Sequence, residues 1–240
     1  MDYLWDQLRQ AIPLVVHGNA YIRAVTWVTI RVALISTGTA LVIGLPMGVA
    51  LALGRFRGRR VLRSLANASL ALPPVVVGVV LVILFVPNGV FGSLNLAFTL
   101  KAVYIAQTIL ALPYIVALTP AAIEALPPGL LGQARALGAG RSQLAVLAVR
   151  EAKTGVLAAV IAALGATLAE VGAVIIVGGN VQNHTQTLAS AALAQVNDFN
   201  NFPYALGTGI VLMLLILGLT AILSVLQWTS GIHLRFRMGA

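Results

Sequence analysis

The sequence predicts an all-α, polytopic membrane helical bundle with about five transmembrane helices, and three observations predict it. Of the 240 residues, 60% are hydrophobic and only 9% are charged, and the mean hydropathy is +0.98. Soluble domains carry about 25% charged residues. The apolar residues form stretches long enough to cross a bilayer, and the basic residues gather in loops between these stretches. A water-soluble core is therefore excluded.

The first element is an amphipathic helix over residues 2–17, with apolar residues at helical spacing on one side and charged or amide residues on the other. Pro13 and the Gly18-Asn19 pair predict a break after it. We therefore expect residues 1–20 to form an interfacial helix on the periplasmic side and residues 21–240 to form the transmembrane domain. The alternative is that the helix is the first turn of a longer transmembrane helix.

Five longer apolar stretches follow, at roughly 24–53, 62–87, 97–123, 155–178 and 205–229. Each reaches the length of about 20 residues that a transmembrane helix needs. An odd number of spans places the two termini on opposite sides of the membrane. The loop RFRGRR (residues 55–60) and Arg63 then share a side with the loop 124–155 and the C-terminal tail, and these segments hold eleven of the 15 basic residues. The positive-inside rule makes that side cytoplasmic, with the N-terminus outside and the C-terminus in the cytoplasm.

Composition argues against several other classes of protein. The net charge of +9 comes without a basic-aromatic surface segment, so no nucleic-acid partner is expected. Cysteine is absent and His184 has no second ligand at metal spacing, so no metal site is expected. The few acids are scattered, so we predict a transport subunit and not an enzyme. An ion-driven carrier, which would normally show inverted repeats, is the distant alternative.

The basic loop at 124–155 predicts a compact helix, turn and helix. Pro127-Pro128-Gly129 ends the third span, and LLGQARALGA then gives a short amphipathic helix. Gly138 and the following Ala139-Gly140 permit a tight bend, after which a second helix that starts near Ser142 leads into the fourth span. A compact element of this kind on the membrane face suits contact with a partner protein.

This loop resembles the coupling loop of ABC importer permeases, in which Glu-Ala-Ala is followed by three residues, Gly, nine residues and a closing Ile-x-Leu-Pro. The match rests on Ala134, Leu137, Gly138 and Ala139, while Gly132 and Gln133 stand where the Glu and the first Ala are usual, and Arg150-Glu151 occupies the closing Leu-Pro position. Three further segments resemble the oxyanion permeases for tungstate, molybdate and sulfate. They are LALPPVVVGVVLV (70–82), AQTILALPYIVALT (106–119) and AEVGAVIIVGGNVQNHTQTL (169–188).

The resemblance implies the fold of the small importer permeases and a permease subunit of the inner membrane that forms the pathway for tungstate. It also implies a homodimer, a tungstate-binding protein outside the cell, and a separate cytoplasmic ABC ATPase that holds ATP and magnesium. No nucleotide-binding motif occurs in this chain, so we expect it to bind no cofactor. Molybdate, sulfate or another solute remain alternatives. Arg135 or Arg141 is expected to make the ATPase contact that the missing Glu usually makes. The residues expected to contact the ATPase are Gln133, Ala134, Arg135, Ala136, Leu137, Gly138, Ala139 and Arg141.

Polar residues at the outer side and inside the spans complete the candidate sites. TLASAALAQV (187–196) is helical in pattern but too short to span, which suits a re-entrant or interfacial helix. The outer segment 178–190 also carries small residues, hydroxyls and backbone N–H groups that could donate hydrogen bonds to an oxyanion. These residues either line the pathway or belong to an ordinary polar loop. They are Gly178, Gly179, Asn180, Thr185, Thr187 and Ser190. Arg31 and Glu170 lie at similar predicted depth, so we hypothesise an ion pair, the alternative being that Arg31 reaches the membrane surface.

Overall fold

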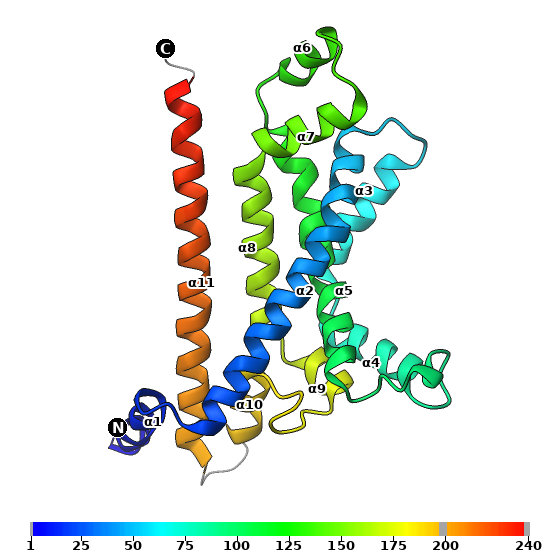
Figure 1. Cartoon of the computed structure of the whole chain (residues 1–240). Helices are drawn as coiled ribbons and strands as arrows, with labels where there is room; N and C mark the ends of the chain where they lie inside the picture. The colour runs from blue at the N-terminus through cyan, green and yellow to red at the C-terminus, as the bar shows by residue number, and fades with distance from the viewer. Residues whose placement is uncertain (1, 197–200, 238–240) are drawn as a thin grey trace. The chain divides into compact units, whose positions relative to one another are not determined.

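The computed structural model describes residues 2–196 and 201–237, and every regular element in those ranges is helical, as predicted (Figure 1). The elements of the first half are α1 Asp2–Val16, α2 Ala20–Leu53, α3 Arg59–Ala68, the 3-10 turn Ser69–Ala71, α4 Pro74–Phe85, the 3-10 turn Gly92–Leu94 and α5 Leu100–Glu124. Those of the second half are α6 Leu130–Ala136, α7 Arg141–Glu151, α8 Lys153–Ala169, α9 Gly172–Gly178, α10 Leu188–Val196 and α11 Phe202–Arg237.

The helices group into two compact units. Unit 1 comprises residues 1–37, 72–110 and 164–219, and unit 2 comprises residues 38–71, 111–163 and 220–240. The helices α2, α5, α8 and α11 therefore contribute residues to both units.

Three helices in the described residues are long and apolar enough to cross a membrane, namely α2, α5 and the Phe202–Trp228 part of α11. Two helix pairs pass the same test together but are bent at a short break. The first joins Arg59–Ala71 to Pro74–Phe85, and the second joins Arg141–Glu151 to Lys153–Ala169. The count reaches the predicted five when each bent pair is taken as one span.

Two of the predicted spans are not continuous helices, and that part of the prediction is wrong. The span expected at 62–87 is interrupted at Pro73, whose backbone is extended (φ −66°, ψ 118°). Since neither Pro73 nor Pro74 has a backbone N–H, the helix stops and α4 starts again with Pro74 at its first turn. The span expected at 155–178 ends as α8 at Ala169, and α9 begins three residues later.

Unit 1 is organised around the close packing of α4 on α9. A Cβ atom placed on Gly78 of α4 would lie only 2.9 Å from the Cα of Ala173 in α9. A Cβ on Gly172 would lie 2.6 Å from Cγ2 of Val75, so small residues on both helices allow this approach. The cluster that surrounds the contact also includes α2 and α5. Its buried members are Val28, Val32, Leu81, Phe85, Ala102, Val103, Ala106, Val174 and Val177.

Unit 2 has an alanine-rich core, in which Ile115 of α5 is surrounded by buried alanines of α2, α5 and α8. A second cluster lies where the ends of α5 and α7 meet α8, and its buried members are Ile123, Ala148, Ala152 and Val156. Because alanine side chains are short, the helices of this unit approach closely and form a firm base for the loop between α5 and α8.

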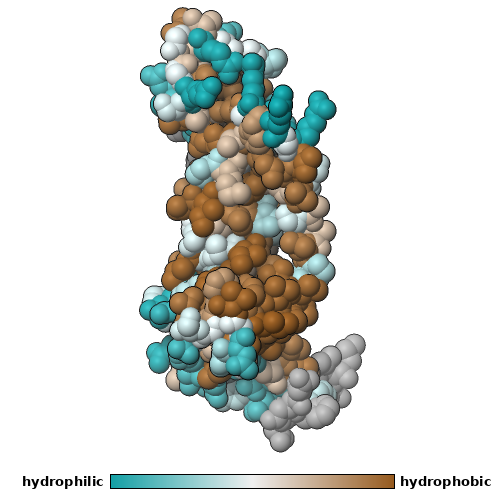
Figure 2. Space-filling model, turned by 90° about the vertical axis from the view of Figure 1, so that its right-hand side faces the viewer, coloured by the Kyte–Doolittle hydropathy of each residue, from teal (hydrophilic) through white to brown (hydrophobic). Residues whose placement is uncertain are grey.

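Apolar side chains also cover much of the surface in view (Figure 2). None of the most apolar 18-residue stretch of α11 is buried. Exposed apolar area on this scale needs lipid or another protein to cover it.

Candidate functional site

The turn between α6 and α7 is a complete helix-ending motif. The N–H of Ala139 donates to the carbonyl of Ala134 (3.0 Å), and the N–H of Gly138 donates to the carbonyl of Arg135 (3.0 Å). These two bonds define a Schellman motif, which requires a left-handed residue after the helix. Gly138 supplies it with φ +89°. The predicted bend at Gly138 is therefore confirmed.

The start of α7 is fixed by a side chain of its own first turn. The N–H of Gly140 donates to Oε1 of Gln143 (2.8 Å), and the N–H of Leu144 donates to the carbonyl of Gly140 (2.9 Å). The α6 motif ends at Ala139 and the α7 cap begins at the next residue, Gly140. With hydrogen bonds on both sides, the turn has little freedom to change its direction.

The helix–turn–helix is anchored to unit 2 at its base. Leu126 and Leu131 pack against the cluster around Ile123, and Leu144 of α7 is buried. The helix α7 then meets α8 at an angle of 70°. The predicted second helix is thus confirmed near Ser142, but it is a separate helix that bends before the span.

The side chains at the tip of this loop are exposed. The side chain of Leu137 is 89% exposed, although it is large and apolar. It lines an open groove of about 400 Å³ together with Ala134, Gly138, Ala139 and Gln143. Arg135 and Arg141 are exposed on the two sides of the turn. The structure therefore brings the predicted ATPase-contacting residues Gln133, Ala134, Arg135, Ala136, Leu137, Gly138, Ala139 and Arg141 into one continuous segment at the turn.

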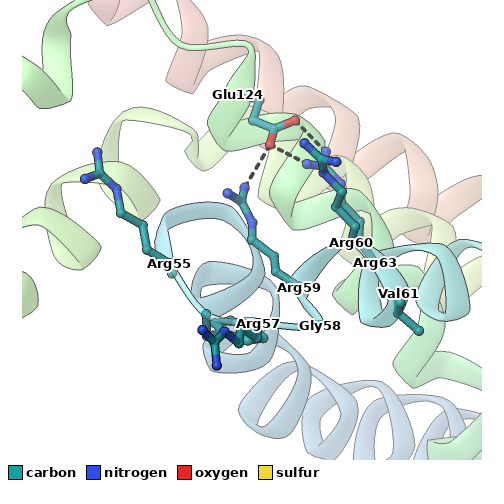
Figure 3. A pocket seen from close by; sticks show the side chains of 10 residues that line it. Arg55, Arg57, Gly58, Arg59, Arg60, Val61, Arg63 and Glu124 are labelled. Carbon is teal, nitrogen blue, oxygen red and sulfur yellow. Dashed lines mark hydrogen bonds and ion pairs between the residues drawn. The ribbon is translucent and has the colours of Figure 1, made fainter.

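An ion-pair cluster at the base of the loop was not predicted from the sequence. Glu124, the last residue of α5, accepts hydrogen bonds from Arg63 of α3 through both carboxylate oxygens and lies 3.4 Å from the guanidinium of Arg59 (Figure 3). Arg59 also donates to the carbonyls of Leu51 (2.5 Å) and Ala52 (2.8 Å) at the end of α2. The position of Glu124 in the sequence could have indicated this cluster. It is an acid at the end of a predicted span, on the same predicted side of the membrane as the basic loop 55–60.

In the outer segment, the hydroxyl of Thr185 organises the turn after α9. It donates to the carbonyl of Gly178 (2.6 Å) and accepts from the N–H of Val181 (2.9 Å). Gly179 has φ +69° and Asn180 has φ +49°, so the backbone reverses here in the left-handed region. The segment is ordered by its own polar groups.

The predicted short helix in this segment is confirmed as α10, and its first turn is buried. Thr187 and Ser190 cap it reciprocally, because the N–H of Thr187 donates to the Ser190 hydroxyl (2.9 Å) and the N–H of Ser190 donates to the Thr187 hydroxyl (3.4 Å). The N–H of Leu188 donates to the hydroxyl of Thr29 in α2 (2.8 Å). Tyr21 of α2 bonds to Gln186 (2.9 Å), which ties the segment to α2 a second time.

The structure thus brings together the six residues predicted to line a pathway, namely Gly178, Gly179, Asn180, Thr185, Thr187 and Ser190. The hydroxyls of Thr185, Thr187 and Ser190 are buried and form hydrogen bonds within the segment. In this conformation they hold the backbone of the segment in place. A contact with substrate stays a prediction.

Arg31 and Glu170, both in unit 1, have partners other than each other. The guanidinium of Arg31 lies over the ring of Trp27, 5.5 Å from its centroid, and the side chain is exposed. The carboxylate of Glu170 accepts from the N–H of Ala173 (2.9 Å) and so caps the start of α9. Their ion pair is absent from the described part of the chain, where both ion pairs involve Glu124. A break after Ala169, invisible in the hydropathy pattern, creates free N–H groups that attract the carboxylate.

One further buried polar group lies in α5. The side chain of Gln107 is fully buried, and within the described residues neither atom of its amide has a hydrogen-bond partner. A buried amide is costly to leave unpaired, so this side chain is a candidate for contact with a water molecule or a solute. No group of three metal-ligating side chains occurs among the residues the structure describes.

Comparison with known proteins relates this architecture to transport. Over residues 40–229 the chain matches the family described as "Binding-protein-dependent transport system inner membrane component". It is 33% identical over 207 residues to the "Probable anion ABC transporter permease protein" of Haloferax volcanii, covering 84% of this chain and 89% of that one. It is 28% identical over 227 residues to the tungstate uptake system permease protein of Peptoclostridium acidaminophilum, covering 95% and 99%.

The fold has also been seen in solved structures. The chain superimposes on a chain of the MetNI methionine ABC transporter in an inward-facing conformation with a TM-score of 0.70 and 22% identity, covering 85% of this chain and 93% of that one. This likeness establishes the shared importer-permease fold. With a family match over most of its length, the chain is a multi-pass membrane protein that belongs to the binding-protein-dependent transport system inner membrane component family, the permease subunits of ABC importers.

Proposed function

We propose that this chain forms the membrane pathway of an ABC importer for tungstate, with molybdate and sulfate as the alternative substrates. The relatives named above support an oxyanion, and one named for tungstate uptake aligns with nearly the whole chain. An oxyanion needs hydrogen-bond donors along its path and no deep charge trap, since the path must release what it admits. Gln107 and the polar segment 178–190 are the proposed sources of these donors.

The observation that carries the proposal is the exposed Leu137 at a rigid turn. An apolar side chain that is 89% exposed at the tip of a charged loop is suited to burial in a partner protein. Because the turn is fixed by the Gly138 motif and anchored at Leu126 and Leu131, a push on the tip moves the base of the loop as a rigid body. The proposed partner is a separate ABC ATPase that binds ATP and magnesium.

Further parts of the proposal concern assembly and orientation. One chain carries one docking loop, so two ATPase subunits imply two copies of this chain. The unburied face of α11 suits a second copy or lipid. The arginine-rich loop between α2 and α3 is proposed to be cytoplasmic, with α1 at the outer interface and a binding protein delivering substrate there.

The central experiment compares Leu137→Asp with Val90→Asp. Val90 is also large, apolar and 78% exposed, but it lies in the loop after α4. We expect Leu137→Asp to abolish co-purification of the ATPase and uptake of isotopic tungstate, because it places a charge where an apolar contact is needed. The control variant should retain both, at equal amounts of protein in the membrane. Normal uptake by Leu137→Asp would refute the docking role.

The absence of cysteine makes a direct test of orientation simple. Val90→Cys and Gly58→Cys each introduce a single thiol in an exposed loop. An impermeant maleimide should label the first in intact cells and the second only after permeabilisation. The reverse pattern would show that the chain has the opposite orientation. Competition of tungstate uptake by molybdate or sulfate then identifies the preferred oxyanion.

A further inference from the structure

The loop between α2 and α3 forms a second pocket, here called the arginine pocket. It is an open hollow of about 840 Å³ lined by residues 54–61, Arg63 and Glu124 (Figure 3). All of these residues belong to unit 2. The pocket lies apart in sequence from the loop tip and has no part in the docking contact proposed for Leu137.

The five arginines of this pocket fall into two groups. Arg59 and Arg63 are half-buried and bound to Glu124, and Arg59 also holds the last carbonyls of α2. The guanidinium groups of Arg55 and Arg57 extend away from Glu124 in Figure 3. Arg55, Arg57 and Arg60 are exposed and form no ion pair in the described part of the chain. Three cations are thus left without a counterion.

Apolar side chains lie beside these free charges. On α3, Val61, Leu62 and Leu65 are 63%, 50% and 59% exposed. A short helix with arginines on one side and bare apolar residues on the other is typical of the boundary between headgroups and acyl chains. A free anion would need only the arginines, whereas a phospholipid uses both features.

We propose that the arginine pocket binds the phosphate headgroup of an anionic phospholipid. Arg55, Arg57 and Arg60 contact the phosphate, to which the guanidinium group presents a matching pair of N–H donors. The apolar side of α3 faces the acyl chains. Glu124 keeps Arg59 and Arg63 out of this contact, and these two arginines hold α3 against the ends of α2 and α5.

The test uses the full purified chain and the variant Arg55→Gln/Arg57→Gln/Arg60→Gln. Native mass spectrometry measures retention of phosphatidylglycerol against phosphatidylcholine. We expect the triple variant to lose selective retention of phosphatidylglycerol roughly tenfold or more, since each arginine near an anionic surface contributes separately. The matched control is Arg135→Gln/Arg141→Gln/Arg150→Gln, which removes the same charge from exposed arginines of the other loop. This control should retain the lipid as the wild type does.

Two outcomes would overturn the proposal. Equal losses in the two triple variants would mean that overall charge, and not this pocket, attracts the lipid. Displacement of the lipid by millimolar inorganic phosphate or tungstate would mean that the pocket takes a free oxyanion. A thermal unfolding scan checks that both variants are folded. The measurement needs neither an ATPase nor transport, so its failure is distinguishable from failure of the proposed importer function.

Discussion

Substitution of Gly138 by alanine tests the link between the geometry of the loop and its docking. The backbone of Gly138 has φ +89°, and a Cβ there would meet no atom within 4 Å. The only penalty is therefore backbone strain, which is about 1–2 kcal/mol for an L-residue in the left-handed region. Since 1.4 kcal/mol is tenfold in an equilibrium constant, relief of that strain by opening the turn should weaken ATPase binding roughly 5- to 30-fold.

Two glycines provide matched controls for this substitution. Gly132 lies in α6 and also has open space around its Cβ position, but its φ is not left-handed, so alanine there should preserve docking and stabilise the helix by up to about 1 kcal/mol. Gly58 has φ +88° and open space but lies in the other loop. Gly58→Ala should carry similar strain without weakening the ATPase contact.

The assay is the affinity of the purified permease for its ATPase, with the rate of ATP hydrolysis as a second readout. Equal affinities for the Gly138→Ala and Gly132→Ala variants would refute the reasoning, because only the Gly138→Ala variant introduces backbone strain. Equal weakening by Gly58→Ala would show that strain anywhere in unit 2 is sufficient.

Two further predictions concern stability in unit 1. Gly78→Ala forces a Cβ against the backbone of α9, so we expect the free energy of unfolding to fall by about 1–3 kcal/mol, seen as a lower thermal midpoint. Gly38→Ala, at a helical position of α2 with open space, should be neutral or stabilising. Thr29→Val leaves the buried N–H of Leu188 without its acceptor, so the free energy of unfolding should fall by about 1–3 kcal/mol. Amide exchange in the first turn of α10 should become faster. Thr26→Val removes a hydroxyl that bonds only within its own helix, so exchange in α10 should be unchanged.

Much of the fold could be predicted because hydropathy and turn residues act locally. The long apolar runs predicted α2, α5 and α11, and the Gly138 turn was predicted because a left-handed helix end nearly requires glycine. The paired prolines Pro73 and Pro74 predict a kink within the second span, but the hydropathy on both sides does not show that the helix is fully interrupted there.

The side-chain partners could not be predicted in the same way. Depth along a span suggested that Arg31 and Glu170 meet, yet depth says nothing about which face of a helix a residue occupies. The carboxylate of Glu170 is used by the start of α9, a helix end that hydropathy cannot reveal. The Glu124 cluster depends on how α3 lies against the end of α5, which is set by packing between segments far apart in the sequence.

The close contact between α4 and α9 has a mechanical consequence. Each helix follows an interruption of the chain, at Pro73 for α4 and after Ala169 for α9. With Gly78 seated against Ala173, neither helix can slide or rotate without the other. We therefore expect the two helices to move together as one body about these interruptions.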